Sequence, residues 1–362
     1  MTSNGVPVEI RPFIGAEADE ATLRQCHELF YADTLRTFPG FPPQPYEAYA
    51  ASARSARYLG IGPRRFWAAW EGGRLLGYAT AVYPDRQSLE WATPRVFVGE
   101  AHRRRGIGTA LLREIVADAR AEGRTRLAYD QVRIGTEGEF WAGAVGFANT
   151  QRTRWQMLYV ADVDRALWDV PAPAGFRLVR WADAAPGDLV DAFAEARNAI
   201  ADAPHGESSH RDTEWTVERV RQAEADVRAA GEEERFVVAV HEPTGAVAAV
   251  TGLLLDRGRV DICWQRDTAV VARFRGNGLG RAVKAAMMRW VVVDIPDLSM
   301  VTTSNAADNT YMIRVNEQIG YTHYADMGQF EASVEQVDAA LKMSAAIPGP
   351  RRESAAEGEP VG

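Results

Sequence analysis

Apolar residues recur along the chain at spacings that predict a regular succession of strands and helices. The segment RRFWAAWEGGRLLGYATAV (residues 64–82) contains two mostly apolar runs around a Glu-Gly-Gly turn, which is typical of a β-hairpin. A Val-rich strand, RVFV, and a glycine turn follow. The next apolar positions have helical spacing and end before Gly123, a residue suited to a helix C-terminus. These positions are Leu111, Leu112, Ile115, Val116 and Ala119.

The same succession occurs a second time. The segment ERFVVAVHEPTGAVAAVTGLL (residues 234–254) predicts another hairpin, and a strand (TAVV) again leads into a glycine turn. The helical stripe after this turn stops before Pro296 and consists of Leu279, Val283, Ala286, Met287 and Trp290. Three ordered pairs relate the halves at offsets of 170, 172 and 174 residues: Phe66 with Phe236, Gly106 with Gly278, and Gly146 with Gly320. We interpret the chain as an internal duplication.

Each half is therefore expected to form a domain with the same order of elements. A helical region comes first (18–57 and 186–230), and the hairpin, the third strand, the glycine turn and the amphipathic helix follow. Each half then ends with a strand, a short helix and a final strand. We expect an N-terminal domain over 1–165, a C-terminal domain over 175–340 and a disordered tail over 341–362. The segment DVPAPAGF (169–176) is the predicted linker.

The glycine turns are the first candidate for chemistry. RRRGIGTALL (103–112) and RGNGLGRAVK (275–284) each place glycines between a strand and a helix. A helix N-terminus has unpaired N–H groups that suit a phosphate, and glycine lets the backbone approach closely. A P-loop would need Gly-Lys followed by Ser or Thr, and a dinucleotide-binding turn would need a third glycine three positions later. Neither pattern is present.

Both halves share the pattern Arg-x-x-Gly-x-Gly, which resembles motif A of the GCN5-related N-acetyltransferases (GNAT family). The resemblance covers roughly 8–160 and 175–335, and the second half, with QRDTAVVARFRGNGLGRAVKAA and NAADNTYMIRVNEQIGY, resembles tandem acetyltransferases of actinobacteria. It implies an α/β fold with a mixed sheet, built from two GNAT domains that form a pseudo-dimer. We expect Trp168, Phe176 and Trp181, which flank the linker, to anchor the contact between the domains.

In this family the glycine turn holds the pyrophosphate of coenzyme A, and the preceding strand pairs with its pantetheine arm. The resemblance thus implies a coenzyme A site in each half. In the first half its residues are Val96, Val98, Arg103, Arg104, Arg105, Gly106, Ile107, Gly108 and Thr109. In the second half they are Val270, Val271, Arg275, Gly276, Asn277, Gly278, Leu279, Gly280 and Arg281, with Asn305 and Asn309 near the thioester or pantetheine.

The resemblance also implies direct attack of an amine on a thioester. The amine must be neutral, and a carboxylate on the central strand, often acting through water, serves as base. Glu90 in the first half and Asp267 in the second are the candidates, with Asp261 as a further one. Asp267 is favoured because Gln265 and Thr268 complete a QxDT pattern that the tandem family shares.

The sequence departs from the family at the general acid. Family members often carry a Tyr four residues before the terminal Gly-Phe or Gly-Tyr, but Ala142 and Asn316 stand there. Protonation of the departing thiolate must come from water or from another residue, such as Tyr311 or Tyr321, or is not needed. Cys263, beside Trp264, is expected to be a core residue.

The composition indicates the cellular environment and the kinds of partner to expect. The chain has 362 residues, a formal charge of −8 and only two cysteines, which fits a reducing cytoplasm without disulfides. No apolar run is long enough to span a bilayer, and the N-terminus lacks a signal-peptide pattern. The negative charge argues against a nucleic-acid partner. We expect no metal, no membrane and no nucleic acid, and either a monomeric pseudo-dimer or a homodimer.

These residues leave three functions open. The first is an acetyl-CoA-dependent N-acetyltransferase acting on the amine of a small molecule, such as an antibiotic or another secondary metabolite. The second is a non-catalytic acyl-CoA-binding protein. The third is an acyltransferase that uses a longer acyl-CoA, or a peptide or protein amine. The helical regions that would shape the substrate pocket carry no recognisable motif, so the sequence does not select the amine.

Overall fold

The first half of the chain folds into strands with helices before and between them. The structure, a computed structural model, describes residues 2–3, 6–58, 61–202, 214–256 and 259–346. The elements of the first half are β1 (Thr2–Ser3), β2 (Val6–Pro7), β3 (Glu9–Phe13), α1 (Glu20–Thr37), α2 (Tyr46–Arg54), β4 (Arg64–Glu71), β5 (Arg74–Val82), β6 (Trp91–Val98), η1 (Glu100–His102), α3 (Ile107–Ala121), β7 (Arg126–Arg133), α4 (Glu137–Ala144), β8 (Ala148–Tyr159) and η2 (Arg165–Trp168).

The second half repeats this order after the linker. Its elements are β9 (Phe176–Ala182), α5 (Val190–Arg197), η3 (Asn198–Asp202), α6 (Val217–Ala229), β10 (Glu232–His241), β11 (Val247–Asp256), β12 (Arg259–Val270), η4 (Ala272–Phe274), α7 (Leu279–Asp294), β13 (Met300–Ala306), α8 (Thr310–Glu317), β14 (Thr322–Ser333) and α9 (Val334–Ala346). Both predicted hairpins are confirmed, as β4–β5 and β10–β11. The predicted mixed α/β fold is confirmed as well.

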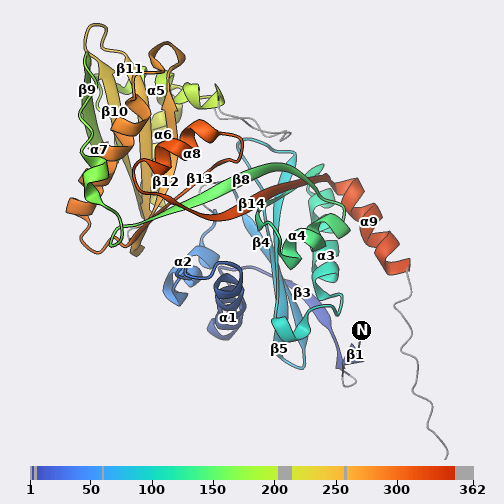
Figure 1. Cartoon of the computed structure of the whole chain (residues 1–362). Coiled ribbons are helices and arrows are strands. Elements are labelled where there is room, and N and C mark those ends of the chain that lie inside the picture. The colour runs from blue at the N-terminus through green and yellow to red at the C-terminus, as the bar shows by residue number, and fades with distance from the viewer. Residues whose placement is uncertain (1, 4–5, 59–60, 203–213, 257–258, 347–362) are drawn as a thin grey trace, which may run out of the picture.

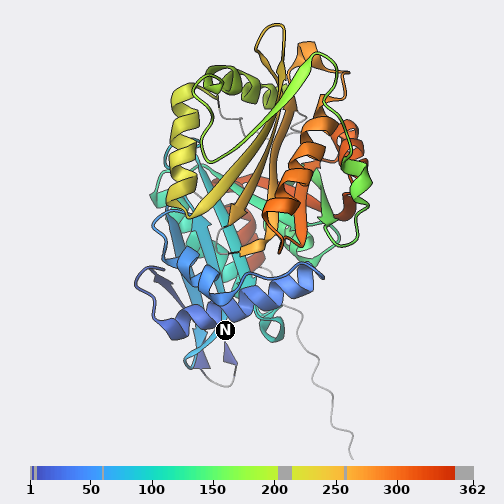
Figure 2. The same cartoon turned by 90° about the vertical axis from the view of Figure 1, so that its left-hand side faces the viewer.

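Helices cover both faces of the strands, because side chains of a strand alternate between its faces. On β10, Phe236 and Val238 pack with α5 and α6, whereas Val237 and Ala239 pack with α7. The first half repeats this arrangement: the face of β4 that carries Phe66 packs with α1 and α2, and the other face packs with α3. Figure 2 shows α6 (yellow) and α7 (orange) on either side of the second-half strands.

The two halves share one sheet, which joins them through exchanged strands. Twelve strands run in the order β3-β4-β5-β6-β7-β14-β8-β13-β12-β11-β10-β9. The last strand of the second half, β14, thus lies between β7 and β8 of the first, and β8 pairs with β13 of the second. Figure 1 shows β8 and β14 crossing the middle of the molecule. The predicted domain boundary at 165–175 separates the two repeats in the sequence. The structural units do not separate there, because strands from each repeat pair with strands of the other.

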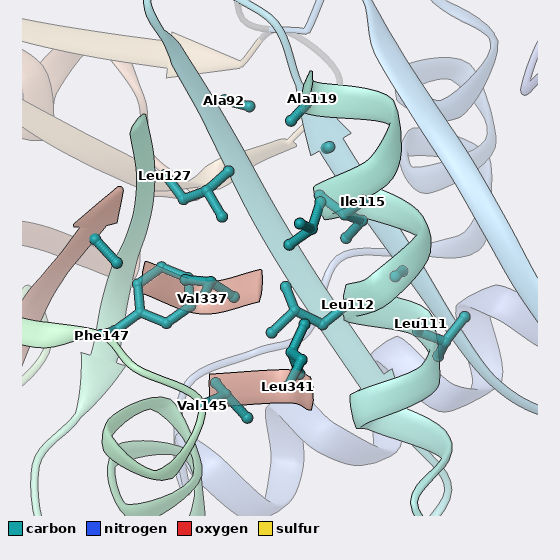
Figure 3. Packing of buried hydrophobic residues seen from close by; sticks show 14 of the residues in the cluster. Ala92, Leu111, Leu112, Ile115, Ala119, Leu127, Val145, Phe147, Val337 and Leu341 are labelled. Atoms are coloured by element: carbon teal, nitrogen blue, oxygen red, sulfur yellow. The ribbon is translucent and has the colours of Figure 1, made fainter. Parts of the chain in front are cut away.

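The segments that follow the exchanged strands complete the core of the opposite half. Val337 and Leu341 of α9 pack with Leu112 and Ile115 of α3, as Figure 3 shows. Residues 341–346, expected to begin a disordered tail, belong instead to α9, and Leu341 is 1% exposed. The rest of the predicted tail, 347–362, lies outside the described residues.

The three aromatic residues expected to anchor the contact between the domains differ in role. Trp168 is buried with the second-half residues of α7, and its indole Nε1 donates to the Ile319 carbonyl at 2.9 Å. Phe176 packs edge-on against Phe274 of the same half. Trp181 belongs to the core under α5. Phe176 and Trp181 therefore do not anchor a contact between the halves. Trp168 fixes the segment after β8 in the second-half core, and the backbone pairing of β8 and β14 also joins the halves.

Both amphipathic helices follow the predicted stripes, with a difference in depth. The five stripe residues of α3 are all buried, and Gly123 ends the helix with a left-handed φ of 70°. In α7 burial extends around most of the helix, because Leu279 to Val291 include ten buried residues. One of these ten residues, Lys284, has an ionisable side chain. A helix buried on nearly all sides leaves little room for a solvated charge.

Candidate acyl-CoA sites

The parallel strands of each half separate shortly after they begin. Strand β6 pairs with β7 at Trp91 and Ala92, and within the described chain this ladder extends no further. Strand β12 pairs with β13 from Ile262 to Trp264 in the same way. We call the unpaired stretches that follow the first opening (residues 93–98 beside 128–133) and the second opening (residues 265–270 beside 303–306). The strand edges there have backbone groups that can pair with an extended ligand.

A glycine turn closes the wide end of each opening and begins a helix. Gly106 and Gly278 precede α3 and α7 with φ of 81° and 72°. No side chain among the described residues caps either helix, so the first N–H groups are free to bind an anion. The turns differ one step earlier, where Gly276 (φ 81°) in the second half has its counterpart in Arg104 (φ 60°). A left-handed conformation costs a non-glycine residue about 1 kcal/mol.

The first arginine of each motif supports the strand before the turn. The Nε atoms of Arg103 and Arg275 donate to the carbonyls of Val98 and Val270, both at 3.2 Å. These contacts make Val98 the counterpart of Val270. Val271 follows β12, and its N–H donates to Ala248 of β11 at 2.9 Å, so that N–H is already paired.

The remaining arginines of the motifs differ in whether they already interact with other side chains. Arg105 pairs with Glu71 at 2.9 Å and contacts His102. Arg104 is exposed. Arg281 follows Gly280 in the first turn of α7, and its Nε is buried without a hydrogen-bond partner in the described part of the chain. Of these three, Arg104 and Arg281 have guanidinium groups available to a phosphate.

Packing within the chain does not require the second glycine of either motif, because a Cβ there would make only ordinary van der Waals contacts. A Cβ on Gly108 would lie 3.6 Å from both Val96 and Val98, and one on Gly280 would lie 3.7 Å from Val270. Ile107 and Leu279 are buried core residues, so they can offer a ligand only their backbone. Thr109 and Asn277 lie beside the turns, and Asn277 Nδ2 donates to the Phe274 carbonyl at 3.0 Å. The helices therefore begin directly against the strand that lines each opening.

Aromatic side chains occupy the first opening. The ring of Trp141 (α4) lies edge-on to Tyr129 (β7), 6.1 Å away, and also approaches Gly108. Burial raises the pKa of Tyr129 to about 12. The charge of Arg95 and a hydrogen bond with the Val96 backbone lower this pKa, but by less than burial raises it. The Tyr129 hydroxyl thus meets the strand edge that a pantetheine arm would use.

The second opening contains a cavity of about 280 Å³. Its lining is mostly polar and comes from both separated strands, from η3, and from α7 and α8. The residues are Ile200, Gln265, Arg266, Asp267, Thr268, Lys284, Thr303, Ser304, Asn305, Ala306, Asn309 and Met312. Asn305 Nδ2 and Gln265 Oε1 are buried there without a partner among the described residues. Unpaired buried polar atoms in a cavity indicate that a ligand or water completes them.

Asp267 lies in this opening, half exposed, on the side of α5. One carboxylate oxygen is 3.8 Å from a guanidinium nitrogen of Arg197, which is itself buried and stacks over the Trp215 ring at 3.3 Å. Arg197 also interacts electrostatically with the buried carboxylate of Glu234. Asp267 is therefore held in place and still open to solvent, as a base that acts through water requires.

The other two carboxylates predicted as bases lie outside the openings. Glu90 precedes β6 at the closed end, where its carboxylate accepts from Trp91 Nε1 at 3.0 Å. Asp261 precedes the paired part of β12 and contacts Arg259 at 3.3 Å. Neither position supports a role as base, because paired strand residues separate it from the opening. Cys263 is buried as expected, and burial raises the pKa of its thiol to about 12.

The two tyrosines predicted as general acids lie in different environments. Tyr311 is 58% exposed on α8. Tyr321 is buried, with its hydroxyl unpaired in the described chain. Asn316, at the position where the family often carries Tyr, donates from Nδ2 to Gln156 of β8 at 2.9 Å. Asn309 accepts from the Met312 N–H at 3.1 Å and caps α8. Asn309 thus has a structural role at the cavity wall.

Sequence reasoning missed Lys284, which lies in the second turn of α7 and lines the cavity. The surrounding run AVKAAMM was a usable signal, because a helix segment without other charges is typically buried on all sides. The counterpart of Lys284 in the first half, at the offset of 172 residues, is Leu112, a core residue. No helix in the described ranges is long and apolar enough to cross a membrane.

Comparison with known proteins agrees with this geometry. Residues 25–134 match the family model of the acetyltransferase (GNAT) family. A tandem GNAT protein from the clavulanic acid biosynthesis pathway is 25% identical, with a TM-score of 0.73 over 91% of this chain and 99% of its own. A GCN5-related N-acetyltransferase from Sphaerobacter thermophilus is 17% identical, with a TM-score of 0.66 over 91% and 97%. No curated protein matches.

Residues 25–134 therefore form a GNAT domain, and the chain as a whole is similar in structure to a tandem GNAT protein. The resemblance predicted from the glycine turns is confirmed. The matched domain belongs to a family of acyl-CoA-dependent N-acyltransferases.

Proposed function

We propose that the protein is an acetyl-CoA-dependent N-acetyltransferase for the amine of a small molecule, and that its second half carries out the reaction. The observation behind the proposal is the polar cavity of the second opening, which lies beside a glycine turn and includes Asp267. The cavity combines a free strand edge with a carboxylate, and the unpaired N–H groups at the start of α7 precede Lys284 of its lining by about one helical turn.

The residues present suit acyl-CoA as a substrate. The free edge of β12 over 265–270 can pair with the amides of the pantetheine arm, and the N–H groups at the start of α7 can bind the pyrophosphate. Arg281 has a guanidinium nitrogen to add. The unpaired Asn305 amide is available to a carbonyl oxygen of the ligand. Acyl-CoA thus supplies the thioester, and the chain supplies the groups that bind it.

Asp267 would take the proton of the attacking amine. An alkylammonium has a pKa of about 10.4, so at neutral pH the amine must lose a proton before its nitrogen can attack. The carboxylate faces α5 and η3, and a neighbouring residue, Ile200, also lines the cavity. We therefore propose that the amine enters from the α5 side, whereas the glycine turn holds the coenzyme on the α7 side.

The test is release of free thiol from acetyl-CoA in the presence of a panel of small amines. Thiol release with a small amine supports the proposal. Release only with longer acyl-CoA, or only with peptide amines, would favour the acyltransferase alternatives. Calorimetric binding of acetyl-CoA without release under any condition would identify a non-catalytic acyl-CoA-binding protein.

The side chains in the first opening favour a different function for the first half. Tyr129 and Trp141 fill the first opening, and Arg95 stands where the second half has Asp267. We propose that the first half binds acyl-CoA only weakly or through its glycine turn, and does not transfer the acyl group. Separate binding measurements on Gly106→Glu and Gly278→Glu test this, since each variant removes one turn.

A further inference from the structure

Lys284 is a buried lysine without a carboxylate partner in the described structure. Its side chain is 1% exposed and lines the second opening together with Thr303 and Asn305. The contact of its Nζ that the structure defines is with the ring of Tyr321, 5.4 Å to the centroid. Burial alone lowers the pKa of its ammonium group to about 7. A buried amine that faces a ligand cavity and lacks an ion pair needs a reason beyond packing.

The choice of lysine is itself informative. The chain has 41 lysines and arginines, and only Lys284 and Lys342 are lysines. An arginine stays charged when buried, whereas a lysine can gain and lose its proton near neutral pH. Lys342 lies on the surface of α9, 2.8 Å from Asp338. The first half has Leu112 at the equivalent position, within its apolar core. The exchangeable proton is therefore specific to the second opening.

The tyrosines of the second half are poorly suited to the role of acid. Tyr311 is exposed on α8, and burial raises the pKa of Tyr321 far above its ordinary value, so Tyr321 would hold its proton. Asn316 cannot donate a proton, and its amide is bonded to Gln156. Lys284 and Asp267 lie on opposite sides of one opening, because α7 and α5 cover opposite faces of the sheet.

We propose that Lys284 is the general acid that protonates the thiolate of coenzyme A as it leaves, an inference that rests on the proposed N-acetyltransferase function. The amine nitrogen bonds to the carbonyl carbon of the thioester, and the carbon–sulfur bond breaks with its electron pair on sulfur. The Lys284 ammonium gives its proton to the sulfur and becomes neutral. Asp267 takes the proton of the amine, and solvent restores both groups between turnovers.

The charged groups around Lys284 support this assignment. Arg266 and Asp267 of β12 line the same cavity, and Tyr321 contacts the amine. Burial is the cause of the lowered pKa, and no charged group in the described part of the chain contributes to it. A thiolate placed in the cavity would therefore be the first strong anionic partner of Lys284. Opposite charges at 4–6 Å typically shift a pKa by about 1–3 units toward the charged forms.

One test is independent of the amine. The pKa of the thiol of bound coenzyme A is measured from the ultraviolet absorbance of the thiolate, in the wild-type protein and in Lys284→Met. We expect the thiol pKa to be about 1–3 units lower in the wild type, because the ammonium stabilises the thiolate. Equal pKa values would overturn the proposal. Lys284→Met removes a buried charge, so it is expected to fold.

The second test measures the step itself, with acetyl-CoA and hydroxylamine, a small nucleophile that is neutral at pH 7 without a base. Lys284→Met should bind acetyl-CoA normally and release thiol about 100-fold more slowly. An aryl thioester, whose leaving group needs no proton, should restore much of the rate. Leu112→Met, the matched change in the first half, should leave the rate unchanged.

The outcomes separate the two proposals. Thiol release that is equally fast in wild type and Lys284→Met would overturn the role of Lys284 and leave the N-acetyltransferase function standing. The absence of thiol release with hydroxylamine and every other amine would overturn the function and the acid role together. Mass spectrometry that finds an acetyl group on Lys284 would show that the lysine is a nucleophile and not an acid.

Discussion

The two openings of the sheet occupy equivalent places in the repeat and differ in what fills them. The first contains the rings of Tyr129 and Trp141, with Arg95 beside it. The second is lined mainly by short polar side chains and holds a cavity with Asp267 and Lys284. The strand separation and the glycine turn are therefore properties of the fold, whereas the chemistry depends on a few side chains. A duplicated site can keep its framework and lose its reaction.

The largest expected effect distinguishes the two glycine turns. Gly278→Glu places a side chain at φ 72° and a negative charge where the pyrophosphate should bind. We expect acetyl-CoA affinity of the second half to fall by at least about 100-fold, or about 2.7 kcal/mol. Calorimetry on this variant, on Gly106→Glu and on the double variant counts the sites. Unchanged affinity and stoichiometry in the double variant would disprove coenzyme A binding at the turns.

A stability measurement tests whether the halves are independent. Leu341→Ala removes a buried side chain that lies in α9 but packs in the first-half core. We expect a loss of about 3 kcal/mol in the free energy of unfolding, measured by denaturant titration. Met343→Ala, on the same helix and 70% exposed, is the matched control and should change it by less than about 0.5 kcal/mol. Equal effects would show that α9 does not complete this core.

A kinetic comparison assigns the base. Asp267→Asn should lower kcat about 100-fold and leave acetyl-CoA affinity nearly unchanged, because the carboxylate lies on the α5 side of the opening, away from the proposed coenzyme site. Glu90→Gln is the matched change in the first half and should leave kcat unaltered. If the Glu90 variant is the damaged one, the roles of the two halves are reversed.

The last comparison concerns the pH dependence of stability, where the change within one pH unit is small. The pKa of Lys284 falls from its ordinary 10.5 to about 7 on folding. Between these values the unfolded chain binds a proton that the folded chain lacks, so folding becomes more favourable as pH rises. The unfolding free energy of the wild type minus that of Lys284→Met should increase by about 1.4 kcal/mol per pH unit in this range. Thermal or denaturant unfolding at several pH values measures it, and a constant difference would contradict the burial of a titrating amine.

The sequence predicted the parts of the fold that depend on local patterns. The hairpins, the stripes of α3 and α7 and the two glycine turns follow from periodicity and backbone chemistry. The strand exchange was not predictable in this way, because β8 and β14 have the same apolar pattern whichever half they join. Burial of Lys284 depends on packing from several elements, which periodicity along one helix does not reveal.

The candidate site could likewise be predicted where it depends on local sequence, and not where it depends on the sheet. The turns were located from motif spacing, and Asp267 from its place on the strand before the turn. Glu90 and Asp261 were equally plausible on a linear sequence, but the ladder between the parallel strands begins just after each of them. Which end of a strand is open is a property of the sheet, and no single strand carries that information.

The exchange of strands also sets the order in which the protein can be completed during synthesis. Arg126 of β7 pairs with Glu331 of β14 at 3.3 Å, 205 residues later in the chain, and Glu331 is buried. The first half therefore remains unfinished while the ribosome makes the entire second half, with the edge of β7 and the α9 side of α3 uncovered. Its folding is coupled to the arrival of the last helix, so translation that stops before α9 should leave the first half incomplete and prone to aggregate.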